Sequence, residues 1–184
     1  MNKETKLKKA FDKKGFDPGA SSLKIFCWYF VSVLFIRSGL IPISSIIVFI
    51  LRLFGAKIGK DVRIKPCIYI HYPWKLIVGD HTWLAECRIE NLDFVTIGKN
   101  VCVSQQAMLL TGNHNYRSEN FDLITKPITL EDGVWIGAST VTCPGITAKS
   151  HSVLTVGAIA TRNLDAYGVY QGNPAIKIKE RTIN

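Results

Sequence analysis

The last third of this chain repeats with a period of six residues. Two series of apolar or small side chains keep this interval: Leu130, Ile136, Thr142, Ala148, Leu154 and Ala160, and Val134, Thr140, Ile146, Ser152, Ala158 and Leu164. A helix has a period of about 3.6 residues and a strand a period of two, so neither explains the interval. A parallel β-helix does, because three units of strand plus corner close one triangular coil. The spacing therefore predicts an all-β, parallel β-helix fold with both series inside.

The same rhythm continues upstream with shifts of frame, each of which indicates an insertion at a corner. Glycine is expected at corners such as Gly137 and Gly145, where a side chain would obstruct the bend or φ must be positive. The largest interruption is the polar stretch 111–127, TGNHNYRSENFDLITKP, which continues neither neighbouring coil. We expect it to leave the prism as an extruded loop.

The pattern divides the chain into three parts: residues 1–54 as a basic arm and apolar helical cap, 55–172 as the β-helix, and 173–184 as a tail. Six lysines lie within the first fourteen residues, and the whole chain has a formal net charge of +9. This arm has two interpretations: a solubilising tail, or a segment attracted to anionic lipid by about 1 kcal/mol per basic residue. Nucleic acid is not expected, because the aromatic residues belong to the apolar segment that follows.

That segment, residues 25–54, contains two apolar runs separated by Arg37 and Pro42. A membrane span needs about 20 consecutive apolar residues, and both runs are shorter. Joining them would bury an arginine in the bilayer and break the helix at proline. We therefore expect two short helices, which either cap the open first coil or lie in a membrane interface.

Cysteine and histidine patterns disfavour a disulfide framework and a metal centre. The five cysteines are odd in number and form no C-x-x-C pair, so we expect small buried residues in a reducing, cytoplasmic setting. A zinc site on a β-helix would need a second histidine soon after His114, and residues 115–126 contain none. No metal is therefore expected.

His114 is the candidate for chemistry among the four histidines. It lies at the root of the extruded loop, where the backbone is anchored and the ring can reach a cleft. His81 and His151 are expected to be solvated at corners, and His71 to pack within the aromatic stretch IYIHYPWK. Because the pKa of an imidazole lies near neutrality, His114 is suited to act as a general base on a hydroxyl.

Several motifs together resemble one family. LLTGNHNYRSENFDLITKPITLEDGVWIGASTVTCPGIT, followed by GNPAIKIKER, is similar to the hexapeptide-repeat O-acetyltransferases related to the maltose, galactoside and nodulation enzymes. RLFGAKIGKDVRI and VTIGKNVCVSQQA resemble the colanic-acid-type branch. The resemblance covers the chain from about Ser22. It implies a left-handed β-helix, acetyl-CoA as donor, a sugar hydroxyl as acceptor, and a homotrimer with active sites between subunits.

The resemblance also implies roles for individual residues. His114 matches the catalytic base, the backbone N–H of Ala138 the oxyanion donor, and Glu90 and Asn91 the residues that orient the base or acceptor. Trp135, Asn113 and Tyr116 would bind the acceptor. Coenzyme A would run along a groove between prisms, contacted by Ala138, Val156, Thr161, Arg162, Lys177, Lys179 and Arg181.

These observations predict a cytoplasmic O-acetyltransferase acting on an exopolysaccharide or lipid-linked glycan precursor, with peripheral association at the inner face of the membrane. Two alternatives remain at this point. One is an acetyltransferase for small free sugars, and the other is a catalytically silent scaffold of a glycan-synthesis complex.

Overall fold

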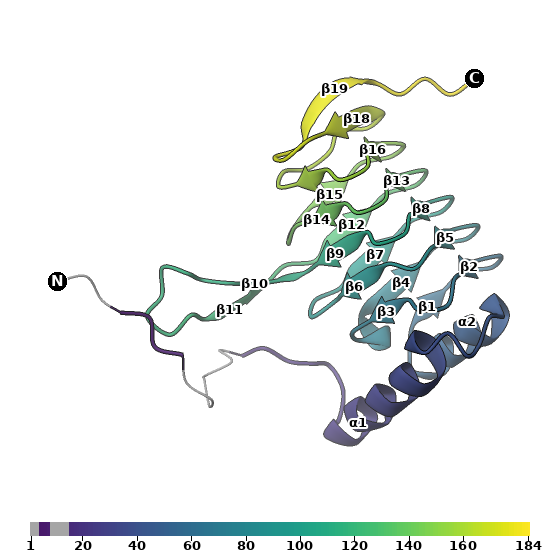
Figure 1. The fold of residues 1–184 in the computed structure, drawn as a ribbon, viewed down its shortest axis with the longest axis vertical. Coiled ribbons are helices and arrows are strands. Elements are labelled where there is room, and N and C mark those ends of the chain that lie inside the picture. The colour runs from purple at the N-terminus through teal and green to yellow at the C-terminus, as the bar shows by residue number, and fades with distance from the viewer. Residues whose placement is uncertain (1–3, 8–14) are drawn as a thin grey trace.

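The computed structural model describes residues 4–7 and 15–184, so most of the predicted basic arm lies outside the described residues. From Lys57 onward the chain winds as a left-handed parallel β-helix with three faces, as the sequence predicts (Figure 1). Each coil contributes one short strand to each face. Within the coils, neighbouring strands in a face are therefore parallel and come from successive coils.

The strands group by face as follows. Face 1 consists of β1 (Lys57–Ile58), β4 (Leu76–Val78), β7 (Val95–Ile97), β12 (Ile128–Leu130) and β15 (Thr147–Ala148). Face 2 consists of β2 (Arg63–Ile64), β5 (Trp83–Leu84), β8 (Cys102–Val103), β13 (Trp135–Ile136), β16 (Val153–Leu154), β18 (Gly168–Gln171) and β19 (Ile176–Glu180). Face 3 consists of β3 (Tyr69–Ile70), β6 (Arg88–Glu90), β9 (Met108–Leu110), β14 (Val141–Thr142) and β17 (Ile159–Ala160).

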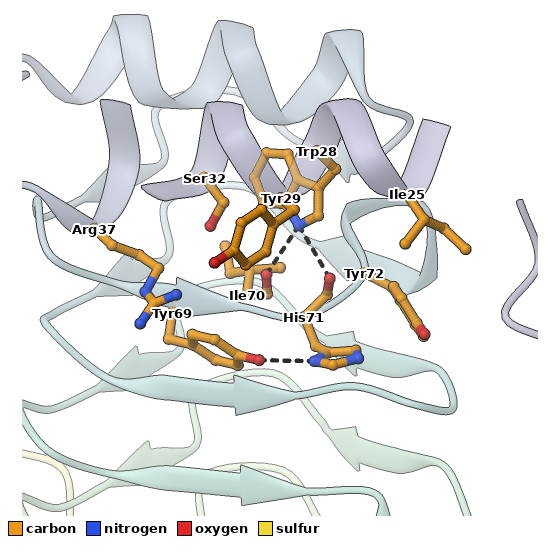
Figure 2. A pocket seen from close by; sticks show the side chains of 9 residues that line it. All are labelled: Ile25, Trp28, Tyr29, Ser32, Arg37, Tyr69, Ile70, His71 and Tyr72. Atoms are coloured by element: carbon orange, nitrogen blue, oxygen red, sulfur yellow. Dashed lines mark hydrogen bonds between the residues drawn. The ribbon is translucent and has the colours of Figure 1, made fainter. Parts of the chain in front are cut away.

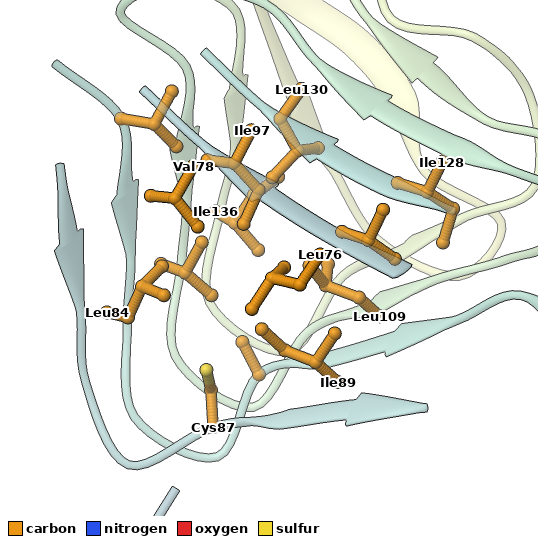
Figure 3. Packing of buried hydrophobic residues seen from close by; sticks show 14 of the residues in the cluster. Leu76, Val78, Leu84, Cys87, Ile89, Ile97, Leu109, Ile128, Leu130 and Ile136 are labelled. Carbon is orange, nitrogen blue, oxygen red and sulfur yellow. The ribbon is translucent and has the colours of Figure 1, made fainter. Parts of the chain in front are cut away.

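Both six-residue series are buried inside the prism, as predicted. The register stacks each member on its equivalent: Val78 and Ile97 lie below Leu130 on face 1, and Leu84 and Val103 below Ile136 on face 2. Figure 3 shows these columns meeting in one core. Since each fully buried aliphatic side chain contributes about 1.5–3 kcal/mol, the columns hold the coils together.

Corners explain the glycines and the shifts of frame. A Cβ on Gly137 would lie 2.7 Å from the carbonyl oxygen of Leu154, so the stacked backbones require glycine there. Gly145 has φ +83°, which L side chains rarely adopt. One frame shift is the 3₁₀ turn η2 (Pro73–Lys75) between the first two coils. The largest is the stretch 111–127, which contains an antiparallel hairpin of β10 (Gly112–His114) and β11 (Leu123–Thr125).

The apolar N-terminal segment forms helices at the end of the prism opposite the C-terminus (Figure 1). Helix α1 (Ser22–Val31) continues into the π-helical turn η1 (Ser32–Arg37), and α2 (Ser44–Leu53) follows after Pro42, which separates the two. Trp28, Ile36, Ile47 and Leu51 are buried in the common core, so the helices cap the first coil. No helix in the described ranges is long and apolar enough to cross a membrane.

The other end of the prism is covered by the C-terminal segment. Sequence analysis assigns residues 173–184 to a tail, but β19 folds back and pairs antiparallel with β18. The strand thus extends face 2 beyond the last coil. It also places Lys177 and Lys179 opposite the final strand of the prism.

Candidate active site

His114 ends strand β10, and its ring has a defined orientation. The imidazole Nδ1 lies 2.8 Å from the carbonyl oxygen of Phe121, and the His114 and Phe121 rings stack with centroids 4.5 Å apart at an angle of 9°. A carbonyl oxygen only accepts hydrogen bonds, so Nδ1 carries the proton of the neutral ring. The lone pair therefore lies on Nε2, the atom that can take a proton from a hydroxyl.

The hairpin that carries His114 is held by its own polar contacts. The Asn115 N–H donates to the Asp122 carbonyl at 2.8 Å, and the Ser118 hydroxyl donates to the Asp122 carboxylate at 2.6 Å. Asn113 accepts a hydrogen bond from the His114 N–H through its side chain, while Tyr116 is exposed at the turn. The Arg117 N–H donates to the side chain of Asn115 at 3.1 Å, an Asx-type bond of the kind that fixes a turn.

Trp135 and Ala138 lie at a different corner from this hairpin. The hairpin leaves the prism between faces 3 and 1, whereas Ala138 lies between faces 2 and 3. Figure 1 shows the hairpin projecting away from β13, the strand of Trp135. One chain therefore does not bring His114 together with either residue.

The corner after β13 offers a donor and an aromatic wall. Trp135 is 48% exposed on face 2, and its indole N–H donates to the Ser104 hydroxyl at 3.0 Å. Among the described residues, none accepts a hydrogen bond from the Ala138 N–H. Exposed Val156 lies in the next coil, where the Gly157 N–H donates to the Ala138 carbonyl at 2.9 Å. An unpaired N–H beside exposed side chains is the donor that an oxyanion requires.

The structure gives Glu90 and Asn91 other partners than His114. Glu90 accepts from the Arg88 guanidinium at 2.6 Å. The side-chain amide of fully buried Asn91 accepts from the Tyr72 N–H at 2.9 Å and donates to the Tyr72 carbonyl at 2.6 Å. Neither residue hydrogen-bonds to His114 in the described part of the chain. The group that orients the imidazole is instead the Phe121 carbonyl, which sequence reasoning missed because a main-chain acceptor leaves no signature in residue type.

The other residues assigned to coenzyme A, besides Ala138 and Val156, lie at three further places. Thr161 and Arg162 are exposed at the corner after β17. Lys179 is exposed on β19, and Lys177 beside it donates to Glu180 at 2.6 Å, a hydrogen bond that raises the pKa of Lys177. Arg181, in contrast, donates to the carbonyls of Gly133 at 2.8 Å and His151 at 3.2 Å.

A pocket of about 280 Å³ lies between α1, η1 and the first coil. Figure 2 shows aromatic and polar side chains around it: Ile25, Trp28, Tyr29, Ser32, Arg37, Tyr69, Ile70, His71 and Tyr72. The Tyr69 hydroxyl lies 2.7 Å from Nδ1 of His71, and burial lowers the pKa of His71. Sequence analysis expected His71 only to pack. The clustering of aromatic residues in IYIHYPWK was the sequence feature that could have indicated a pocket there. An aromatic wall with hydrogen-bonding tips suits a sugar ring.

Two expectations about single residues are wrong. His151 is not solvated, because its ring stacks on Tyr167 with centroids 4.9 Å apart and its Nδ1 is buried. Cys27 and Cys67 are exposed rather than buried, although all five cysteines are free. In the described part of the chain, no three His, Cys, Asp or Glu side chains are grouped so that they could hold a metal ion.

Triangular coils, each built from three units of about six residues, are the architecture of the hexapeptide-repeat class of left-handed β-helix proteins. No family model matches the sequence. The chain is 35% identical over 169 residues to the putative colanic acid biosynthesis acetyltransferase WcaF of Escherichia coli strain K12, covering 91% of this chain and 92% of that protein. It belongs to the hexapeptide-repeat acetyltransferases, in the branch of that relative.

Solved structures agree on the fold. A hexapeptide-repeat acetyltransferase of Vibrio cholerae complexed with acetyl coenzyme A matches with a TM-score of 0.78 and 20% identity, over 92% of this chain and 94% of that one. A galactoside acetyltransferase in complex with coenzyme A matches with a TM-score of 0.77 and 23% identity, over 90% and 85%. These likenesses concern the architecture alone.

Proposed function

We propose that this protein transfers the acetyl group of acetyl-CoA to a hydroxyl of a sugar unit in an exopolysaccharide precursor. The observation that carries the proposal is the free Nε2 of His114, fixed by the hydrogen bond from Nδ1 to Phe121. Membership in an acetyltransferase family whose relative is assigned to colanic acid biosynthesis supports both the reaction and the class of acceptor.

The proposed reaction is a direct transfer without an acyl-enzyme. Nε2 of His114 takes the proton of the sugar hydroxyl while that oxygen bonds to the thioester carbon. The oxyanion that forms accepts a hydrogen bond from the Ala138 N–H. When the carbon–sulfur bond breaks, the coenzyme A thiolate leaves and the imidazolium returns the proton to it. The products are an acetyl ester and free coenzyme A, and no redox step occurs.

We further propose that the working unit is a homotrimer with sites at the seams between subunits. The position of His114 and Ala138 on different corners of one prism supports this, since a neighbouring copy could bring the hairpin of one chain to the corner of the next. In such a seam, Trp135, Asn113 and Tyr116 would face the acceptor. Val156, Thr161, Arg162, Lys177 and Lys179 would line the groove for coenzyme A, with Arg181 holding the main chain of the last coils.

Intersubunit complementation tests the shared site. His114→Ala and Ala138→Pro chains, each inactive alone, are co-expressed, and acetyl-CoA consumption by the mixed oligomer is measured. If His114 and Ala138 of different chains form one site, some sites in the mixture carry both native residues and activity returns. If one chain forms the whole site, the mixture stays inactive. Sedimentation of each variant checks that assembly is retained.

A small free sugar is the second candidate acceptor, because the galactoside O-acetyltransferase of Escherichia coli is 31% identical over 130 residues, covering 68% of this chain and 64% of that protein. Acetyl-CoA consumption across free sugars and lipid-linked glycans, with mass spectrometry of the product, separates the two. Acetylation of free galactosides at rates equal to the glycan precursors would overturn the preferred acceptor.

A further inference from the structure

We propose that the outward side of the helical cap is a docking surface for an anionic lipid bilayer. Six apolar side chains on α1, η1, the linker after η1 and α2 point away from the prism and are 46–72% exposed: Phe26, Phe30, Leu34, Ile43, Phe49 and Leu53. We call this set the cap face. Single exposed apolar residues are common, but an aromatic-rich patch spanning two helices marks an interaction surface.

The cap face is not needed to hold the helices on the prism. The opposite side of the same helices does that through buried Trp28, Ile36, Ile47 and Leu51. The Trp28 indole N–H also donates to the carbonyls of Ile70 at 3.2 Å and His71 at 3.0 Å, which anchors α1 (Figure 2). Helix α1 is therefore apolar on both sides, whereas a surface helix facing water has a polar outer side. The outer side has the composition of a helix that contacts lipid.

Charge selects an anionic bilayer as the occupant. Between Asp17 and Asp61 the sequence contains no acidic residue and five basic ones: Lys24, Arg37, Arg52, Lys57 and Lys60. Arg37 lies in the pocket over the Tyr69 ring, so the other four carry the charge available to a lipid surface. Basic residues beside an apolar helix face are attracted to anionic lipid headgroups. A second copy of this chain would instead bring like charges together. Aromatic side chains such as Phe26 and Phe49 favour the interfacial depth of a bilayer.

Docking also defines where the acceptor comes from, a step that rests on the proposed function. The 280 Å³ pocket lies directly behind the cap, and Ile25, Tyr29 and Arg37 contribute to it from the cap itself. A sugar carried by a lipid would therefore meet this pocket first on leaving the docked bilayer, before its hydroxyl reaches the proposed seam with His114 and Ala138. In a cyclic trimer, symmetry places three cap faces at one level along the axis, so three weak contacts add.

Vesicle co-sedimentation of the full chain tests the surface without any sugar or acetyl-CoA. Vesicles of phosphatidylcholine alone are compared with vesicles containing phosphatidylglycerol. The test variant is Phe26→Gln with Phe30→Gln and Phe49→Gln. The matched control is Phe94→Gln with Ile183→Gln, which removes exposed apolar side chains outside the cap. We expect binding to the anionic vesicles, weaker by at least about tenfold in the cap variant and unchanged in the control.

A second measurement remains informative if the triple variant folds poorly. Cys27 is exposed on α1, and a polarity-sensitive dye on this thiol, in a Cys67→Ser chain, should shift its emission to shorter wavelengths when anionic vesicles are added. Unchanged emission, or equal vesicle binding by the cap variant and the native chain, would overturn the docking surface. So would a larger oligomer in solution that the cap variant abolishes, because the face would then be a protein interface. Acetyl-CoA turnover with a soluble acceptor is measured separately, so failure of the chemistry is distinguishable from failure of docking.

Discussion

Replacing His114 tests the mechanism most directly, and the structure separates its two roles. In the proposed reaction the ring supplies Nε2 as the base, and in the structure it holds the hairpin through Nδ1 and through its stack on Phe121. Loss of a general base lowers turnover by about 10²–10⁴-fold, which is roughly 3–5 kcal/mol in the barrier. Loss of the hydrogen bond costs about 1 kcal/mol and loss of the stack about 0.5–1.5 kcal/mol, both confined to the hairpin.

Two substitutions resolve these roles. His114→Ala removes the base and the donor, whereas His114→Asn removes the base but keeps an N–H that can reach the Phe121 carbonyl. We expect both variants to lose turnover equally, measured as thiol release from acetyl-CoA in the presence of acceptor. We expect only His114→Ala to lose hydrogen-exchange protection in β10 and β11, while the prism unfolds at an unchanged temperature. Turnover of His114→Asn within about threefold of native would refute Nε2 as the base.

Three further predictions concern residues around the core and the pocket. Asn91→Ala should lower the free energy of unfolding by about 1–3 kcal/mol, because its buried amide makes two hydrogen bonds to the main chain of Tyr72. The folded variant should keep its turnover, and a hundredfold loss of turnover would instead make Asn91 catalytic. Burial raises the pKa of Cys87 to about 12, so iodoacetamide at pH 8 should alkylate exposed Cys27 and spare Cys87 in the native state, as peptide mass spectrometry would show. Burial lowers the pKa of His71 in the folded state. The stability tied to its neutral form is therefore present above about pH 6.5, the usual pKa of histidine, and is lost as pH falls through that value toward the folded pKa. The free energy of unfolding, measured by urea titration from pH 7.5 to 5, should depend less on pH for His71→Gln than for the native chain, and an equal dependence would contradict this.

The fold could be predicted from the sequence because equivalent positions in successive coils have the same buried environment. Leu130, Ala148 and their equivalents occupy one environment repeated along the axis, so the spacing alone reveals them. The extruded stretch was visible for the complementary reason that it breaks the pattern. Its antiparallel pairing was not visible, since the hairpin is held by turn contacts such as that of Ser118 with Asp122.

Side chains at the ends of the prism were harder to predict, because their environment occurs once. The sequence suggests Arg181 as a phosphate ligand, a role that stays a prediction. It did not reveal that the chain folds back at β19, so that the Arg181 guanidinium donates to the carbonyls of Gly133 and His151. The exposure of Cys27 follows from which side of α1 meets the core, and a helix that is apolar all round does not specify that side. Periodicity constrains repeated positions and leaves terminal ones undetermined.

The candidate site could not be assembled from the sequence, and a single chain does not bring its proposed residues together. His114 and Ala138 are close in sequence, but the hairpin begins at the corner before face 1, and two more strands, β12 and β13, pass before Ala138. The triangular cross-section therefore places the proposed base and the proposed oxyanion donor at different corners of one prism. In the proposed reaction the thioester meets both groups at once, so the proposal requires a second prism that brings its own corner to the hairpin. If this proposal holds, activity depends on assembly, and complementation between inactive chains is the measurement that decides it.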